Sequence, residues 1–221
     1  MPARRPDQIR TTTRARIAAV AGLACAATAL TACAGGGNPP ANTATETGPM
    51  DGYVKVLDDP RKEWPFKFEH HDFGIACYDA IGCQVRYGGD FPHGARDEDE
   101  RSPPKRGDLK EAQRGWNGTR LAVEAFAGPV RARWKSLDGE QHEVTIDLDE
   151  VFPDRAVLHD VKFEELSDRG AVGRPEIVVA IDDRTISVWM RAMVPLKELD
   201  DPNNRFTKIR NKWIKAWSRT L

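Results

Sequence analysis

Apolar and polar side chains alternate in two neighbouring stretches of the chain. Every second residue is apolar from 130 to 135, and the same period returns over 143–148. This period is typical of strands that bury one face, and the Asp-Gly pair between the two stretches indicates a turn. We predict an antiparallel hairpin that places Trp134 opposite Val144, with a bulge at Gly139 and the intervening charges on a solvated outer face rather than in a binding patch.

A second hairpin is predicted over 176–194, with its turn around 182–185. Placing Ile181 opposite Ile186 also brings Glu176 opposite Arg191, so one register satisfies both faces of the pair. The first strand is apolar on both faces, which places it at the centre of a sheet.

Two earlier stretches, 66–76 and 84–87, also have the character of strands. They add to the two hairpins to give an α+β fold, built mainly from an antiparallel β-sheet of six or more strands. The loop over 92–108 between them and the first hairpin is dense in charge and contains two consecutive prolines.

The period changes at the C-terminus, where Asp201 can cap a helix and Pro202 suits its first position. An amphipathic helix is predicted, with an apolar face that packs on the sheet. That face consists of Phe206, Ile209, Trp213, Ile214 and Trp217. The opposite face is basic, so contact with a membrane surface or an acidic partner is the alternative role.

The first 32 residues have the order of a bacterial export signal. Five arginines precede an uncharged run over 17–30 that is too short and too rich in alanine to be a membrane-spanning helix. Leu30-Thr31-Ala32-Cys33 then resembles the lipobox of bacterial lipoproteins, which implies cleavage before Cys33 and acylation of that cysteine. The alternative is ordinary secretory cleavage beside an incidental cysteine.

Several acyl chains on Cys33 would hold the protein stably at a membrane, since one chain binds only marginally. Ala34 after the cysteine favours the outer membrane, facing the periplasm, by the usual sorting pattern of such lipoproteins. We therefore expect a lipid-anchored protein of the cell envelope.

Residues 33–50 are rich in Gly, Asn, Pro, Ala and Thr and are predicted to form a flexible tether. The remaining 51–221 is the size of one domain. Removal of residues 1–32 takes five Arg and one Asp from a chain of net charge −1 and leaves −5. A mildly acidic protein lacks the basic surface of a nucleic-acid-binding protein, so nucleic acid is excluded as a partner.

Two cysteines, Cys77 and Cys83, remain after processing and acylation. In the oxidising envelope such a pair is more typical of a disulfide than of a metal site, which needs further ligands. We predict one local disulfide.

The sequence contains no motif that carries catalysis. It has no G-x-S-x-G elbow, no phosphate-binding glycine loop and no H-E-x-x-H metal motif. His70 and His71 point to opposite faces of a strand, so we interpret His71 as a packing or orienting residue, and we assign His159 the same role. Carboxylates such as Asp147 need no motif, but at this spacing they are usually solvated. We expect a protein that is not an enzyme and that uses no metal or cofactor.

Several phrases of the sequence together resemble a known family. They are Phe66-Lys67-Phe68-Glu69-His70-His71-Asp72-Phe73, Cys77-Tyr78, Gly82-Cys83, Trp134-Lys135-Ser136-Leu137-Asp138-Gly139, Asp183-Arg184-Thr185-Ile186-Ser187-Val188, Arg191-Ala192 and Pro195-Leu196-Lys197. They are similar to the immunity lipoproteins that are paired with type VI secretion phospholipase effectors of the third lipase class.

The resemblance implies a periplasm-facing lipoprotein that binds an incoming cognate lipase and neutralises it stoichiometrically. It marks no contact residues. On physical grounds we expect the acidic run Asp97, Glu98, Asp99 and Glu100 to steer the encounter and Trp116 to anchor it. Plain solvation is the alternative for the run. A structural or assembly lipoprotein, or an envelope hydrolase with unmarked carboxylates, remains the alternative function.

Overall fold

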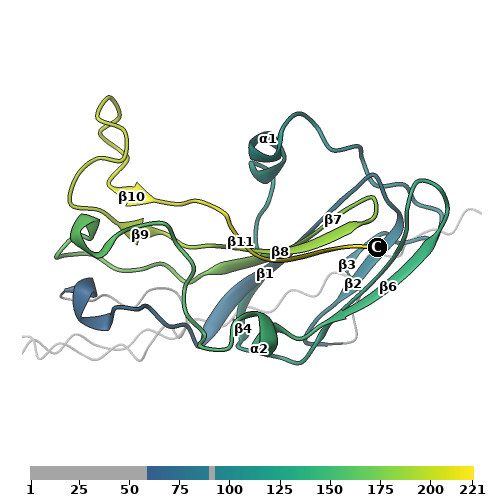
Figure 1. Cartoon of the computed structure of the whole chain (residues 1–221), viewed down its shortest axis with the longest axis horizontal. Helices are drawn as coiled ribbons and strands as arrows, with labels where there is room; N and C mark the ends of the chain where they lie inside the picture. Colours follow the sequence, from purple (N-terminus) through teal and green to yellow (C-terminus); the bar gives the residue numbers. More distant parts are fainter. Residues whose placement is uncertain (1–58, 90–92) are drawn as a thin grey trace, which may run out of the picture. The chain divides into compact units, whose positions relative to one another are not determined.

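The computed structural model describes residues 59–89 and 93–221 (Figure 1). The predicted signal peptide, the lipid site at Cys33 and the predicted tether lie outside these residues. None of the helices among these residues has the length and hydrophobicity of a membrane span.

Strands dominate the fold and are arranged in three sheets. The first half contains η1 (Pro60–Glu63), β1 (His70–Tyr78), β2 (Ile81–Arg86), β3 (His93–Gly94), α1 (Leu109–Gln113), β4 (Arg120–Glu124), β5 (Val130–Lys135) and β6 (Gln141–Ile146). The second half contains α2 (Leu148–Val151), η2 (Phe163–Glu165), β7 (Glu176–Asp182), β8 (Thr185–Arg191), β9 (Val194–Pro195), β10 (Ile209–Arg210) and β11 (Ile214–Thr220).

A five-stranded sheet has the order β11-β8-β7-β1-β4, and a four-stranded sheet has the order β3-β2-β5-β6. A third, two-stranded sheet pairs β9 with β10. All pairs are antiparallel except β1 with β7, which run parallel. The prediction of a mainly antiparallel β-rich fold is confirmed.

One hydrophobic core joins the five-stranded and the four-stranded sheet. Its fully buried side chains come from the inner faces of both sheets, for example Val179 and Val188 from one and Val85 and Trp134 from the other. The Trp134 indole donates a hydrogen bond to the carbonyl oxygen of Asp183, at the β7–β8 turn, over 2.6 Å. This bond fixes one end of the two sheets against each other.

The second predicted hairpin is confirmed in every pair. Ile181 faces Ile186, and Glu176 faces Arg191, whose guanidinium binds the carboxylate at 2.8 Å. β7 lies at the centre of its sheet, as its two apolar faces require.

The first hairpin forms, but its predicted register is wrong by two residues. Trp134 pairs with His142, and Ala132 pairs with Val144. The shift keeps the apolar set on the buried face, because the side-chain period of a strand is two. Alternation alone therefore could not separate the two registers.

The predicted C-terminal helix is wrong. β11 pairs with β8 along the edge of the five-stranded sheet, and β10 pairs with β9. A bulge between Lys215 and Trp217 interrupts the alternation of β11. Trp213 and Trp217 are four residues apart in the sequence, which imitates helical spacing, but Trp217 packs against the main core and Trp213 against the cluster on the outer face. Without β11, the apolar strand β8 would form an open sheet edge.

Candidate functional site

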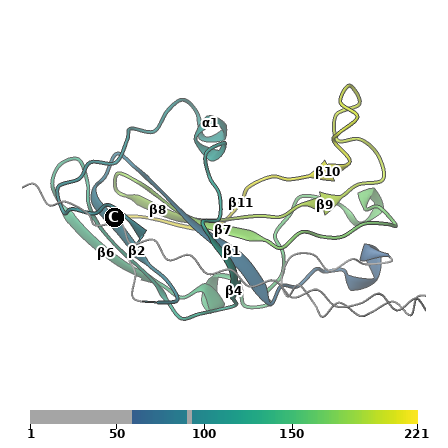
Figure 2. The ribbon, with the colours of Figure 1, turned by 180° about the vertical axis from the view of Figure 1, so that it is seen from behind.

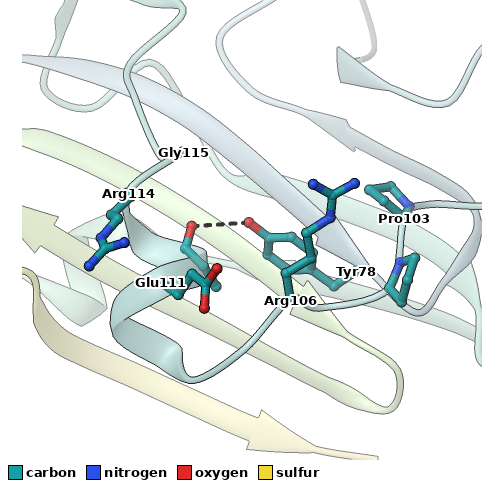
Figure 3. A pocket seen from close by; sticks show the side chains of 8 residues that line it. Tyr78, Pro103, Arg106, Glu111, Arg114 and Gly115 are labelled. Carbon is teal, nitrogen blue, oxygen red and sulfur yellow. Dashed lines mark hydrogen bonds between the residues drawn. The ribbon is translucent and has the colours of Figure 1, made fainter.

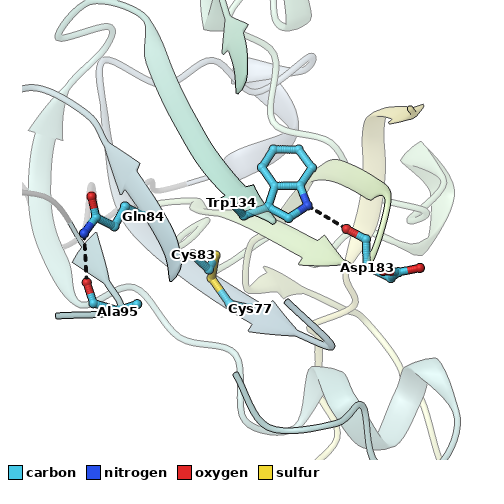
Figure 4. Close-up of a disulfide and its surroundings, with 6 residues drawn as sticks. All are labelled: Cys77, Cys83, Gln84, Ala95, Trp134 and Asp183. Carbon is cyan, nitrogen blue, oxygen red and sulfur yellow. Dashed lines mark hydrogen bonds between the residues drawn. A yellow bond between two sulfur atoms is a disulfide. The ribbon is translucent and has the colours of Figure 1, made fainter. Parts of the chain in front are cut away.

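The disulfide lies at the corner where the chain passes from one sheet to the other. Cys77 near the end of β1 and Cys83 in β2 are joined by a bond of 2.01 Å, with their Cα atoms 6.4 Å apart (Figure 4). The predicted disulfide is confirmed. Because β1 and β2 belong to different sheets, this bond holds the two sheets together at the turn over 79–80.

A loop containing the acidic run is hydrogen-bonded to this corner along its backbone. The amide of Gly82 donates to the carbonyl oxygen of Glu100 at 2.9 Å, and the amide of Ser102 donates to that of Ala80 at 2.8 Å. The amide of Asp79 donates to the carbonyl oxygen of Pro103 at 3.2 Å. Residues 97–103, which we name the acidic loop, are therefore held to the corner much as one strand is held to another.

Gly82 makes this close approach possible. Its φ is +59°, and a Cβ atom built there would lie 2.4 Å from the carbonyl oxygen of Glu98. Any other side chain would have to displace the acidic loop or the corner.

Two carboxylates of the acidic loop point into solvent. The side chains of Glu98 and Asp99 are 74% and 95% exposed, and each lies 3.5 Å from a cation of β5, Arg133 and Lys135 respectively. Exposed pairs of this kind are weak, so both carboxylates are available to a partner. Glu100 is different, since its carboxylate accepts a hydrogen bond from the Arg96 amide at 2.7 Å and closes the loop.

Trp116 does not join this surface. It is only 4% exposed, and its indole donates to the Tyr78 hydroxyl at 2.9 Å. Its ring packs edge-on against Trp189 and Trp213 and covers the outer face of the five-stranded sheet. The expectation that Trp116 anchors a partner is therefore wrong for this conformation. Its physical role is to bury an apolar face that lies outside the main core.

A groove beside the acidic loop offers an anchoring position in place of Trp116. It encloses about 420 Å³ between the end of the loop and α1, with the Tyr78 ring in its floor (Figure 3). Its remaining lining residues are Pro103, Pro104, Arg106, Glu111, Ala112, Arg114 and Gly115. The Tyr78 hydroxyl already donates to the Ala112 carbonyl oxygen at 3.3 Å, so the tyrosine offers mainly its ring.

Arg106 and Arg114 bring two positive charges to the groove, and Glu111 brings one negative charge. Neither guanidinium forms a hydrogen bond or an ion pair with another residue of 59–89 or 93–221. An apolar floor between unpaired guanidinium groups suits an apolar or aromatic side chain that is flanked by carboxylates.

The histidine that the sequence singled out is part of a buried network. His71 is fully buried, and its Nε2 lies 2.8 Å from the Tyr87 hydroxyl. Burial lowers the pKa of His71 to about 4 and raises the pKa of Tyr87 to about 12. The next residue, Asp72, is paired with Arg174 at 2.7 Å and accepts a hydrogen bond from the Ala122 amide. The side chains are shielded from solvent, which agrees with the interpretation of His71 as a packing and orienting residue.

The other candidate groups lie apart from the acidic loop. The His159 ring packs against Trp64 with centroids 4.9 Å apart, and burial lowers its pKa. Asp147 caps α2 by accepting the Asp149 amide. Across the described ranges, no three His, Cys, Asp or Glu side chains gather closely enough to hold a metal ion.

The groove arginines were not singled out from the sequence, because Arg106 and Arg114 are separated along the chain by α1 and resemble solvated charges. Comparison of the chain with known protein families, with curated proteins and with solved structures gives no match. The geometry and the sequence phrases are therefore the basis for any statement about function.

Proposed function

We propose that this chain is an envelope-anchored immunity protein that binds a type VI secretion phospholipase and blocks it stoichiometrically. The export signal and lipobox at Leu30–Cys33 would place it in the compartment that such a toxin enters. The sequence phrases resemble those of lipase immunity lipoproteins. The protein acts by binding rather than by catalysis in this proposal.

The observation that carries the proposal is the acidic loop held on the disulfide corner. A binding surface gains affinity when its groups are fixed before the encounter, because less ordering entropy is lost on association. Three backbone hydrogen bonds and a disulfide fix this loop, while Glu98 and Asp99 remain exposed. Fixed and exposed carboxylates can steer a basic surface of the toxin into place.

The groove supplies the second half of the surface. An apolar side chain of the toxin would be buried on the Tyr78 ring, and carboxylates of the toxin beside it would bind Arg106 and Arg114. Buried apolar contacts at the centre of an interface commonly contribute most of the binding energy. The proposed toxin surface thus has a basic patch next to an apolar and acidic one.

Survival on co-expression tests the proposed function. The proposal expects a lipase gene beside this one, and its product is directed to the periplasm with and without the full chain. We expect survival to require the chain and a stable complex to be recovered. Survival that does not depend on the chain, or the lack of a neighbouring lipase gene, would contradict the proposal.

Neutralising two carboxylates tests the surface itself. Glu98→Gln with Asp99→Asn should lower the association rate with the lipase by about tenfold at low salt and much less at high salt, because steering is screened. The matched control is Asp149→Asn with Glu150→Gln, which makes the same charge change on α2, away from the acidic loop. Equal effects of both double variants in stopped-flow measurements would argue against this surface.

A further inference from the structure

Exposed apolar side chains are concentrated in one part of the described structure. Eight large apolar side chains are exposed in the whole described structure, and five of them lie in three segments: 59–66, 159–166 and 193–212. They are Trp64, Phe163, Met193, Phe206 and Ile209. Phe206 is the most exposed, at 77%. We name these three segments the aromatic lobe.

The segments of the aromatic lobe are held together by specific contacts. The ring centroids of Trp64 and Phe163 are 5.8 Å apart, which joins the first segment to the second. Glu165 accepts from the Arg210 guanidinium at 3.2 Å, and Lys212 binds Asp160 at 2.9 Å, which joins the second segment to the third. The lobe is therefore one structural unit.

The tip that carries Phe206 is fixed by its own hydrogen bonds. The Thr207 hydroxyl accepts from the Asp201 amide at 3.0 Å and lies 2.7 Å from the Asn204 carbonyl oxygen, to which it donates. The Phe206 amide donates to the Asn204 side chain at 3.1 Å. The exposure of the Phe206 ring thus follows from a built turn.

Basic side chains accompany the Phe206 ring, whereas Trp64 follows Glu63 and Phe163 lies between Lys162 and Glu164. The Arg205 guanidinium lies 4.8 Å from the centroid of the Phe206 ring, and Lys208 follows two residues later. Neither forms an ion pair with another described residue. Aromatic rings with neighbouring cations match the headgroup level of a bilayer, where rings partition and cations meet anionic lipids.

The chain also enters its described part through this lobe. Asp59 and η1 belong to the first segment, and about 26 residues separate Asp59 from Cys33. Counted along the chain from the proposed lipid on Cys33, the aromatic lobe is therefore the first part of the described structure.

We propose that the aromatic lobe rests on the lipid surface, with Trp64, Phe163 and Phe206 at the headgroup level and Arg205 and Lys208 facing anionic lipid. This inference rests on the lipid anchor of the proposed function but not on toxin binding. The lobe and the acidic loop lie at opposite ends of β8 (Figures 1 and 2). β9, which belongs to the lobe, follows the last residue of β8. At the other end, Asp182 pairs with the first residue of β8 and binds Lys105, which follows the acidic loop. The contact would turn the acidic loop away from the membrane.

Fluorescence quenching tests this orientation with the full lipidated chain. The vesicles contain phosphatidylethanolamine, phosphatidylglycerol and phosphatidylcholine brominated on its acyl chains. Phe206→Trp adds a reporter to the lobe, and Leu137→Trp adds one at another exposed apolar position, 50% against 77% for Phe206, beside Asp183 at the opposite end. We expect quenching of the added signal to be at least about twofold larger for Phe206→Trp, because only that ring reaches the headgroups. Trp64→Phe should in turn reduce the quenching of the parent chain.

Each contrary result has a separate meaning. A chain that floats with the vesicles while both added reporters are quenched equally, or not at all, would overturn the lobe contact alone. A chain that does not float would overturn the anchor and the lobe contact together. No lipase is present, so the outcome is independent of toxin binding. Urea unfolding of both variants checks that the fold is intact.

Discussion

His71 illustrates how a residue with chemical potential can serve the fold. It is enclosed by aromatic rings, and its Nε2 lies 2.8 Å from the hydroxyl of Tyr87, whose backbone carbonyl oxygen in turn accepts a hydrogen bond from Arg120. The imidazole is neutral at physiological pH, because burial lowers its pKa to about 4 from an ordinary value of 6.5. The free energy of unfolding must therefore depend on pH through this residue.

The sign of that dependence is fixed by which state binds the proton. Between pH 6.5 and 4 the unfolded chain protonates His71 and the folded chain does not, so stability is full above pH 6.5 and falls as the pH drops towards 4. The loss is on the order of 3 kcal/mol. We expect His71→Gln to lower stability at pH 7 but to flatten the slope between pH 6.5 and 4 in urea titrations.

Tyr87→Phe is the matched control for this prediction. It removes the same hydrogen bond but leaves a buried imidazole, so the slope should persist. If His71→Gln keeps the slope of the natural chain, His71 is not the group responsible.

At the scale of elements, the corner between β1 and β2 determines where the acidic loop lies. The Cys77–Cys83 disulfide closes the corner, and Gly82 allows the backbone of the loop to approach it. The carboxylates of Glu98 and Asp99 are therefore positioned by an element that itself carries no chemistry.

Comparison of Gly82→Ala with a second glycine variant separates two contributions to the loss of stability. One is the steric contact with the acidic loop, and the other is the general strain of alanine in a left-handed backbone. Gly139, with φ of +88° and no atom within 4 Å of a built Cβ, is the matched control. Alanine at either position strains the backbone by about 1 kcal/mol, and only at Gly82 does it also meet the Glu98 carbonyl oxygen. We expect Gly82→Ala to destabilise by at least about 1 kcal/mol more than Gly139→Ala and to speed exchange of the backbone amides at position 82 and at Ser102. Equal stability of the two variants would show that the contact is relieved without cost.

At the scale of the whole molecule, the proposed anchor, lobe and acidic loop act in sequence. Lipid on Cys33 would hold the domain at a surface, the aromatic lobe would orient it, and the acidic loop would face the periplasm. Tethering raises the concentration of an inhibitor where its target arrives.

Cys33→Ser, expressed in the periplasm, should therefore weaken protection against the lipase without changing the affinity of the complex in solution. Cell survival over a range of expression levels measures the first effect, and calorimetry measures the second. We expect protection by this unlipidated form only at higher expression. Full protection at the natural level would mean that the lipid serves only for targeting.

The sequence by itself determined the elements whose patterns are local. The β7–β8 hairpin was predicted in its correct register, because both of its faces carry information: apolar pairs on one and the Glu176–Arg191 pair on the other. The disulfide was predicted from cysteine number and compartment. The acidic run was recognised from its charge.

Only the tertiary structure decided the rest, because those features depend on contacts between distant residues. The segment after Pro202 has helical spacing, yet its last part forms β11 and pairs with β8. This pairing satisfies the backbone groups at the edge of β8, which a short helix would leave without partners. Phe206 is predicted to be buried on a helix, but it is the most exposed large apolar side chain among the described residues. Trp116 is predicted to be available to a partner, but it is buried. Both outcomes depend on contacts between residues that are distant in the sequence. The groove at Tyr78 exists only because the acidic loop returns across the disulfide corner to reach α1.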